Sequence, residues 1–208
     1  MFIGHYAVGF ALKKKADEIP LWLLYISVQL VDILAFSFVL LGVERIAYNP
    51  TDNPFLRTII EYVPYSHSLF ANLLLAALVF LIFQKIRGRK WGIILGGGVL
   101  SHWFIDTLVH KGDMPLFHNS FKVGLGLWQY PWLAFLFELV IFGLAGYYLL
   151  KNYQKLKRYL VLIFLMGAGF AAMFFAPEAE GTPVQVAISN LLLYAIFTAL
   201  ACWCERRR

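Results

Sequence analysis

Charged residues are scarce in this sequence, and their scarcity excludes an ordinary soluble domain. Asp, Glu, Lys and Arg together make up 14% of the 208 residues, whereas hydrophobic residues make up 61%. In a typical soluble domain about a quarter of the residues are charged and about half are apolar. The composition therefore indicates that lipid surrounds most of the chain. Its length suits a single domain, residues 1–208, built as one helical bundle with short loops.

Cysteine is nearly absent, which excludes a disulfide framework and a thiolate-rich metal site. Cys202 and Cys204 are separated by one residue, too close for an easy structural disulfide, and two thiolates alone do not complete a zinc site. Acidic residues are fewer than basic ones, so the net charge is +6. In a soluble protein this excess would suggest a nucleic-acid partner. Here the basic residues form short runs between apolar stretches, as in membrane proteins, and no nucleic-acid partner is expected.

Long apolar runs are what the sequence has instead of charge. Most of them approach the roughly 20 residues that a helix needs to cross a bilayer. Helices are expected because an open sheet leaves its backbone groups unsatisfied in lipid. The predicted fold is therefore an all-α polytopic membrane bundle of about six spans, with membrane lipid as a partner. The apolar runs cover residues 20–41, 68–83, 92–109, 131–150, 159–176 and 184–204.

The charges of the loops predict an orientation in the plasma (inner) membrane. Strongly basic segments alternate along the chain with segments that carry little net positive charge. Because basic loops stay in the cytoplasm, the C-terminus is expected there and the other loops on the outer side. The basic segments are residues 13–15, 85–90, 151–158 and 206–208, and the intervening loops are 42–65, 111–130 and 177–183.

The first twelve residues are too short for a further span, since they reach only about 18 Å as a helix. If the basic run after them is cytoplasmic, they form either an interfacial helix or a half-helix with a buried N-terminus. A buried half-helix is tolerable when it packs against protein. Gly4, His5 and Gly9 do not make a basic polar face. The half-helix is therefore favoured.

Ionisable side chains inside the predicted spans are costly, which makes them functional candidates. The most specific pattern is His102, Asp106 and His110, which are spaced i, i+4 and i+8 and so share one helical face. Three metal-capable side chains on one stripe favour a metal or proton-handling role over a structural polar network. The other candidates in or beside the apolar runs are His5, Asp32, His67 and Glu138.

These candidates fall at overlapping depths, about 12–30 Å above the basic ends of the helices at about 1.5 Å per residue. A shared site in the middle and outer half of the membrane is therefore possible. Imidazole and carboxylate ligands without thiolate suit zinc, ahead of iron, manganese or nickel. A carboxylate can bridge two ions, and a two-metal site activates water and stabilises a developing phosphoryl charge.

Separated motifs that carry these residues resemble the YdjM/YbcI-type family of membrane-bound metal-dependent hydrolases. They occur in order, and the resemblance covers roughly residues 1–150, leaving 159–204 as two further helices. The motifs are MFIGHY at 1–6, QLVD at 29–32, PYSHS at 64–68, LSHWFID at 100–106, DMPL at 113–116 and KVGLGLW at 122–128.

That family is distantly similar to zinc-dependent phospholipase C and the S1/P1 nucleases, all-helical enzymes that bind a zinc cluster. The resemblance implies one to three zinc ions. Ala134 stands where those enzymes carry a His four residues before the Glu, so a ligand of the third ion is missing here. The implied metal ligands are, in chain order, His5, Asp32, His67, His102 and Asp106, followed by His110 and Glu138, with His118 as a further candidate.

The expected function is a zinc-dependent, phospholipase C-like hydrolase that acts on a phosphoester or phospholipid at the outer leaflet. An activated water would attack phosphorus, with Asp32 or Glu138 as the catalytic base. Lys111 and Lys122, in a loop expected outside, would attract an anionic head group.

Two other classes of function stay open. A proton or metal-ion transporter or channel would also use an intramembrane row of Asp and His. Neither an inverted repeat nor a pair of broken spans is visible to support it. The run Gly96-Gly97-Gly98 is interpreted as a close-packing surface. The third class is a scaffold in which buried polar groups only hold the helices together.

Overall fold

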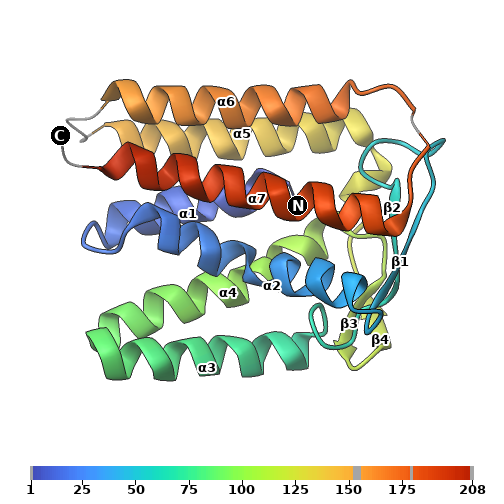
Figure 1. Ribbon diagram of the computed structural model, residues 1–208, viewed down its shortest axis with the longest axis horizontal. Coiled ribbons are helices and arrows are strands. Elements are labelled where there is room, and N and C mark those ends of the chain that lie inside the picture. The colour runs from blue at the N-terminus through green and yellow to red at the C-terminus, as the bar shows by residue number, and fades with distance from the viewer. Residues whose placement is uncertain (1, 152–155, 179, 207–208) are drawn as a thin grey trace.

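Over the residues that the computed structural model describes, 2–151, 156–178 and 180–206, the chain forms seven α-helices and two short β-hairpins (Figure 1). Six of these helices are long and apolar enough to cross a membrane. The chain is therefore an all-α bundle of a multi-pass membrane protein, which confirms the predicted fold class. The helices are α1 (Gly4–Lys15), α2 (Leu21–Leu40), α3 (Leu69–Arg87), α4 (Arg89–Val109), α5 (Pro131–Leu150), α6 (Leu156–Phe174) and α7 (Pro183–Glu205).

The short helix α1 lies inside the bundle. In Figure 1, α1 and α2 run between the pair α3 and α4 on one side and the group α5, α6 and α7 on the other. Helix α1 contacts α2, α4 and α5, and its side chains Tyr6 and Phe10 are almost completely buried. This position agrees with the predicted half-helix packed against protein and not with an interfacial helix.

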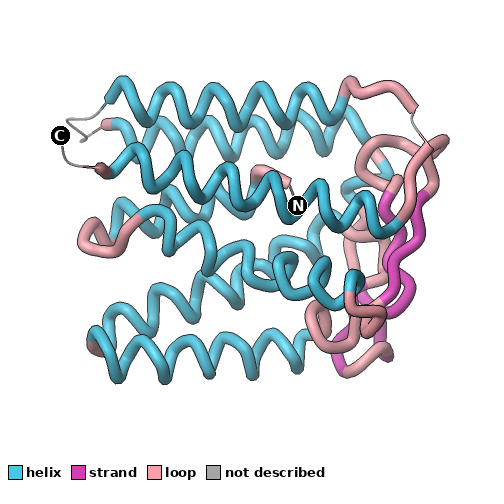
Figure 2. Tube along the Cα trace, in the orientation of Figure 1, coloured by secondary structure: helices cyan, strands magenta, loops and turns pink. Residues whose placement is uncertain are grey.

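The two hairpins lie together at one end of the bundle (Figure 2). Strands β1 (Arg45–Tyr48) and β2 (Thr58–Tyr62) pair antiparallel after α2, and β3 (Met114–Phe117) and β4 (Ser120–Val123) pair antiparallel after α4. A single 3-10 turn, Leu127–Gln129, leads into α5. The sequence analysis expected only helices. Strands of four or five residues are too short to give a readable alternation, so these pairings were missed.

Glycines let α4 approach its neighbours closely. A Cβ atom at Gly96 would lie 2.8 Å from the carbonyl oxygen of Ala76 on α3, and one at Gly98 would overlap the Ser27 hydroxyl on α2. A Cβ atom at Gly97 would meet nothing within 4 Å. The predicted close-packing surface is therefore confirmed for Gly96 and Gly98, whereas Gly97 faces open space.

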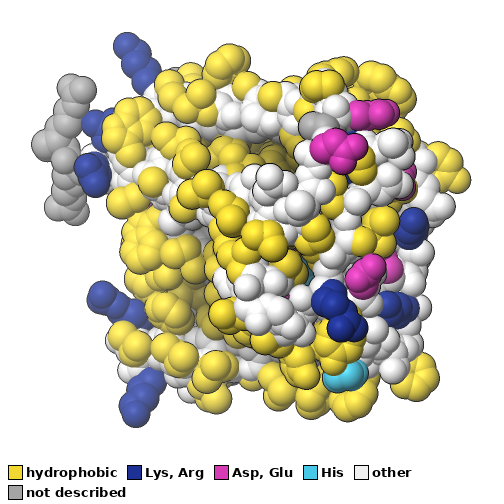
Figure 3. Space-filling model, turned by 45° about the vertical axis from the view of Figure 1, so that its right-hand side comes forward, with side chains coloured by type: hydrophobic (Ala, Val, Ile, Leu, Met, Phe, Trp, Pro, Cys, Tyr) yellow, Lys and Arg dark blue, Asp and Glu magenta, His cyan; other side chains and the backbone are white. Residues whose placement is uncertain are grey.

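Apolar side chains cover much of the outside of the helices. On α3, Leu74, Leu78 and Leu81 are each more than half exposed. Figure 3 shows hydrophobic side chains over the helical surface, with charged side chains mostly toward the two ends. This distribution is what a bundle surrounded by hydrocarbon requires, because only its ends meet water and head groups.

Candidate metal centre

Four separate segments bring His and Asp side chains to one place inside the bundle. Helix α1 supplies His5, α2 supplies Asp32, and α4 supplies both His102 and Asp106 one turn apart. His67 comes from the residues just before α3. The four side chains other than Asp32 are at least 93% buried, while the side chain of Asp32 keeps 16% of its surface exposed. All five were predicted as metal ligands, and the structure brings them together.

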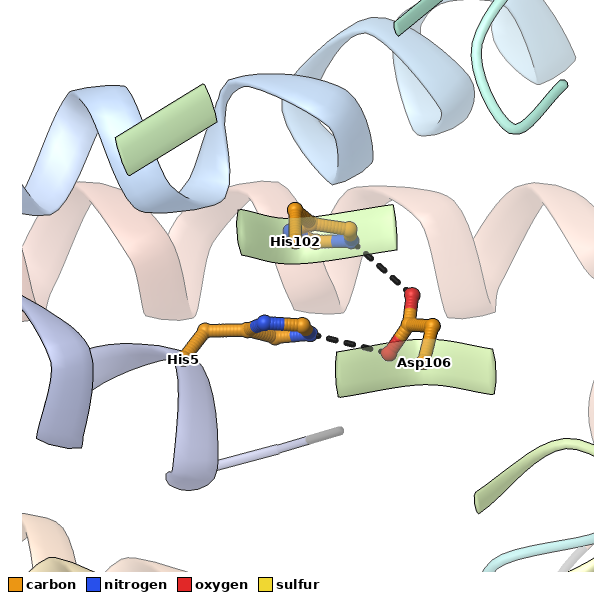
Figure 4. A group of neighbouring side chains, drawn as sticks. All are labelled: His5, His102 and Asp106. Atoms are coloured by element: carbon orange, nitrogen blue, oxygen red, sulfur yellow. Dashed lines mark ion pairs between the residues drawn. The ribbon is translucent and has the colours of Figure 1, made fainter. Parts of the chain in front are cut away.

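The first half of the cluster consists of two stacked histidines that face one carboxylate (Figure 4). The rings of His5 and His102 are nearly parallel, with centroids 3.7 Å apart. His5 Nε2 lies 3.0 Å from Asp106 Oδ1, and His102 Nε2 lies 3.0 Å from Asp106 Oδ2. Each oxygen of Asp106 thus faces a different histidine, an arrangement suited to a carboxylate that bridges two ions.

The second half of the cluster joins Asp32 and His67 to the same His102. Asp32 Oδ1 lies 3.3 Å from His67 Nε2 and 3.5 Å from His102 Nε2. His67 Nε2 is also 3.8 Å from Asp106 Oδ2. Either of two groups could hold a metal ion, His5–His102–Asp106 or Asp32–His67–His102, because the ligand atoms within each group lie within 4.8 Å of one another. The groups share Nε2 of His102, which can bind only one ion at a time.

Buried ring nitrogens in this cluster fit a bound metal ion. His5 Nε2 and His102 Nε2 lie 3.0 Å from the Asp106 oxygens, but neither contact has hydrogen-bond geometry. His5 Nδ1 is buried as well and has no hydrogen-bond partner among the described residues. A buried polar atom left without a partner costs about 1–3 kcal/mol. Imidazole and carboxylate are ligands that zinc accepts. A divalent ion would therefore satisfy atoms that the described part of the protein leaves unsatisfied.

The proton positions on His102 also suit a metal ligand. His102 Nδ1 lies 2.8 Å from the carbonyl oxygen of Val28. A carbonyl oxygen only accepts hydrogen bonds, so Nδ1 carries the proton and donates it. Nε2 is then the ring nitrogen that faces the cluster and is available to a metal ion. Metal-binding histidines are commonly oriented in this way by a hydrogen bond from the other ring nitrogen.

Asp32 is held by two side chains that leave one of its oxygens free for the cluster. Its Oδ2 accepts hydrogen bonds from Gln29 Nε2 at 3.0 Å and from the Tyr194 hydroxyl at 3.1 Å. Its Oδ1 faces His67 and His102. The sequence analysis missed Tyr194, which lies on α7, 162 residues after Asp32. A tyrosine in an apolar helix carries no sequence signal for such a contact.

Glu138, a predicted ligand or base, is held away from the two ligand groups by hydrogen bonds at the start of α1. Its Oε2 accepts hydrogen bonds from the backbone N–H groups of Phe2, Ile3 and Gly4 at 2.9, 3.0 and 3.3 Å. Its Oε1 accepts one from Trp128 Nε1 at 3.4 Å. The first N–H groups of a helix lack partners within it, and a carboxylate there also interacts favourably with the helix dipole. Glu138 therefore caps α1 and lies outside both ligand groups.

His110 and His118 also lie outside the two groups. His110 Nδ1 is 3.0 Å from Asp113 Oδ1, and its ring packs on Trp128. Burial acts to raise the pKa of Asp113, but the hydrogen bond with His110 and the charge of that ring outweigh it and leave the pKa lowered. His118 lies between β3 and β4, where its Nε2 is 3.3 Å from the Tyr62 hydroxyl.

A cavity of about 680 Å³ leads from the cluster toward the hairpin end. Asp32, His67 and Asp106 line it at the cluster, and His110 lines it as well. Apolar side chains of α2, α6 and α7 form much of its wall, among them Phe36, Met173 and Leu193. A cavity of this size, apolar with a few polar groups, is typical of sites for small organic ligands.

Arg57 is a cationic side chain in the wall of this cavity. Its guanidinium donates to the carbonyl oxygens of Asp52 and Ala176, at 3.3–3.4 Å. Among the residues that the structure describes, no carboxylate forms an ion pair with it. The predicted head-group residues Lys111 and Lys122 are exposed and do not line the cavity. A lone arginine in a loop gives no pattern, so sequence reasoning missed Arg57.

Fold and site together define a class, a helical membrane protein with a buried His–Asp cluster at the inner end of an apolar cavity. No protein-family model, curated protein or solved structure matches the chain. The resemblance of its motifs to the YdjM/YbcI-type family therefore stays a prediction.

Proposed function

We propose that this protein is a membrane-bound, zinc-dependent hydrolase that acts on a phosphoester, and that its substrate is a phospholipid. The observation that carries this proposal is the pair of three-residue ligand groups that share His102 and face an apolar cavity. An ion-binding cluster alone would suit many roles. A cluster at the end of a cavity large enough for an organic ligand suits catalysis on that ligand.

Each residue of the cluster has a distinct role in this proposal. His5, His102 and Asp106 hold one ion, and Asp32 and His67 complete a place for a second. When bound, zinc supplies an activated water and stabilises negative charge on the phosphoryl group. Asp32 is the candidate base, because Gln29 and Tyr194 hold its Oδ2 and leave Oδ1 directed into the cluster. The apolar walls exclude water from the reacting group.

A lipid substrate is favoured by the combination of apolar walls with one cationic side chain. Met173 and Leu193 offer a surface for an acyl chain, and Arg57 offers hydrogen-bond donors for an anionic head group. Guanidinium groups bind phosphate oxygens through paired hydrogen bonds. Arg57 replaces Lys111 and Lys122 as the residue proposed to contact the head group.

The proposal places the cavity on the outer side of the plasma (inner) membrane and the C-terminus in the cytoplasm. Basic residues gather where α1, α3 and α7 end, at Lys13–Lys15, at Lys85 and Arg87, and at Arg206. The hairpins and the cavity lie toward the opposite end. By the positive-inside rule the basic end faces the cytoplasm.

The test is to measure zinc content and hydrolysis on the same purified protein. The full chain in detergent micelles is expected to retain bound zinc and to release a phosphorylated head group from a defined phospholipid. Asp106→Asn keeps the side-chain shape but removes the charge of a candidate ligand. We expect it to lose zinc and to hydrolyse at least about 100-fold more slowly, since metal ions contribute several kcal/mol to such reactions. His118→Ala, in a histidine outside the cluster, is the matched control.

If Asp106→Asn hydrolyses the substrate as fast as the wild type, the proposed hydrolase function is overturned. A different result would support the transporter: proton or metal flux in proteoliposomes that Asp106→Asn abolishes, without any hydrolysis by the wild type. If the protein binds no metal, hydrolyses nothing and transports nothing, the scaffold is the class of function that remains. The measurements therefore separate all three classes of function.

A further inference from the structure

We infer that Glu44 is a positioning residue that acts through Ser66 to hold His67 in the ring orientation and proton state that a metal ion requires. The inference deepens the proposed function, because it concerns the same metal centre. It comes from a chain of three buried side chains, Glu44, Ser66 and His67, at 1%, 1% and 5% exposure.

Glu44 is a buried carboxylate bound only by hydrogen bonds in the described part of the chain. It follows α2 in the turn before β1. Its Oε1 accepts from the backbone N–H groups of Tyr65 at 2.8 Å and Ser66 at 2.9 Å. Its Oε2 accepts from the Ser66 hydroxyl at 2.6 Å. Burying a carboxylate without a cation is costly. The dense hydrogen bonding of Glu44 to Tyr65 and Ser66 offsets that cost and points to a specific role.

The donors and acceptors in this chain have one consistent arrangement. An ionised carboxylate only accepts hydrogen bonds, so the single proton of the Ser66 hydroxyl points at Glu44. Ser66 Oγ can then only accept from His67 Nδ1, which lies 2.8 Å away. Nδ1 therefore carries a proton. His67 Nε2 is the ring nitrogen that faces the cluster, 3.3 Å from Asp32 Oδ1.

This arrangement is a carboxylate–histidine pair with a serine inserted between the two groups. Carboxylates that accept from the outer nitrogen of a metal-binding histidine fix its tautomer and raise its basicity. In His102 the carbonyl oxygen of Val28 does the same directly. Both histidines of the Asp32–His67–His102 group therefore turn Nε2 toward Asp32 Oδ1, and a hydrogen bond at Nδ1 holds each ring in place.

The serine is itself held in place, so the chain is rigid. Asn72 of α3, which is completely buried, donates from Nδ2 to the carbonyl oxygen of Ser66 at 2.6 Å. Glu44 holds the N–H of the same residue from the other side. Glu44 thereby joins the two ends of the β1–β2 hairpin, 22 residues apart, directly behind the metal centre.

Glu44→Gln tests the inference with little change of shape. The new amide can donate to Ser66 Oγ, after which the Ser66 hydroxyl donates to His67 Nδ1 and Nδ1 carries no proton. Nitrogen-15 NMR of the metal-free, histidine-labelled protein reads this directly. The chain has five histidines, so a His67→Ala spectrum identifies the signal. We expect Nδ1 of His67 to be protonated in the wild type and unprotonated in Glu44→Gln.

Zinc affinity, measured by competition with a chromophoric chelator, is the second readout. Glu44→Gln and Ser66→Ala are both expected to weaken zinc binding about 10–100-fold, the usual effect of losing an outer partner of a ligand. Ser66→Thr keeps the hydroxyl and should restore affinity. Ser68→Ala is the matched control. Ser68 is equally buried beside His67, but its hydroxyl bonds to Pro64 and caps α3 instead.

The inference is overturned if folded Glu44→Gln keeps Nδ1 of His67 protonated. It is also overturned if Ser68→Ala weakens zinc binding as much as Ser66→Ala does, which would mark a merely structural effect. Because the protonation of His67 is read without metal or substrate, it decides the positioning role even if the wild type hydrolyses nothing. If the wild type shows the expected protonation of His67 but no hydrolysis, the proposed function is overturned and the positioning role of Glu44 stands.

Discussion

At the scale of single residues, Arg57 gives the most specific prediction about the substrate, namely that its head group is anionic. Its guanidinium is bound by carbonyl oxygens, which leave its charge uncompensated by any carboxylate of the described chain. We expect Arg57→Gln to raise KM for an anionic phospholipid about tenfold or more, because a hydrogen bond to a charged group contributes about 1.5–3 kcal/mol. The value of kcat should change little if the contact is equally strong before and during the reaction.

Lys122→Gln is the matched control for that measurement. Lys122 is exposed on β4 and does not line the cavity, so its loss should leave KM unchanged. An equal rise of KM in both variants would mean that general attraction by the loops, and not the cavity, selects the substrate. Thermal unfolding of each variant shows whether the fold is intact.

The ligand residues could be found from sequence for a reason that does not extend to their partners. His and Asp are rare inside apolar runs, so His102 and Asp106 at helical spacing stand out. Serine and tyrosine are common in membrane proteins, so Ser66 and Tyr194 carry no signal of their own, and their roles depend on contacts with Glu44 and Asp32, which are distant in sequence. Glu138 lies outside both ligand groups, because depth along a helix does not tell which neighbour a carboxylate faces.

At the scale of elements, the glycines of α4 position its ligands. A Cβ at Gly96 would lie 2.8 Å from the Ala76 carbonyl oxygen and 3.2 Å from Phe80 Cβ, both on α3. Backbone cannot yield without moving the helix. We expect Gly96→Ala to destabilise the protein by about 1–3 kcal/mol, the usual cost of overpacking. It should also weaken zinc binding, because α4 carries His102 and Asp106.

Gly97→Ala is the control at the adjacent position. Its Cβ would meet nothing within 4 Å. Alanine is favoured over glycine within a helix by about 1 kcal/mol, so this variant should be neutral or slightly stabilised. Thermal unfolding of the two variants in the same detergent makes the comparison. Equal destabilisation by both would show that helix flexibility, and not close packing, is why glycine is needed.

The elements themselves were largely predictable, with errors of a consistent kind. Hydropathy placed the second span at residues 68–83, whereas α3 runs Leu69–Arg87 and includes Lys85 and Arg87. Hydropathy marks where a helix meets hydrocarbon, but the backbone hydrogen bonds continue into the basic end. The hairpins were not predicted, because their strands are short and their pairing depends on the helices that bring them together.

At the scale of the whole molecule, the last two helices belong to the site. The sequence analysis set residues 159–204 apart from the metal core. In the structure, α7 supplies Tyr194 to Asp32, and Met173 of α6 and Leu193 of α7 line the cavity. At the other end of the bundle, Lys13 of α1 forms an ion pair with Glu205 of α7 at 2.7 Å. The central helix α1 is thus tied to this late part of the chain.

The orientation of the whole molecule in its membrane gives the last prediction. We expect the hairpin end outside and the basic end in the cytoplasm. Single cysteines at Ser120→Cys, on β4, and Arg89→Cys, at the start of α4, report on the two ends, because both positions are exposed. The background carries Cys202→Ser and Cys204→Ser, which removes both natural thiols.

In right-side-out spheroplasts, a maleimide that cannot cross membranes should label Ser120→Cys and spare Arg89→Cys until the membrane is permeabilised. The physical reason is the positive-inside rule, which counts the Lys and Arg of short loops near the helix ends. The reverse labelling pattern would put the cavity on the cytoplasmic side. An outer-leaflet substrate would then have to be abandoned, whereas the metal centre and its ligands would stand, since neither depends on which side the cavity opens.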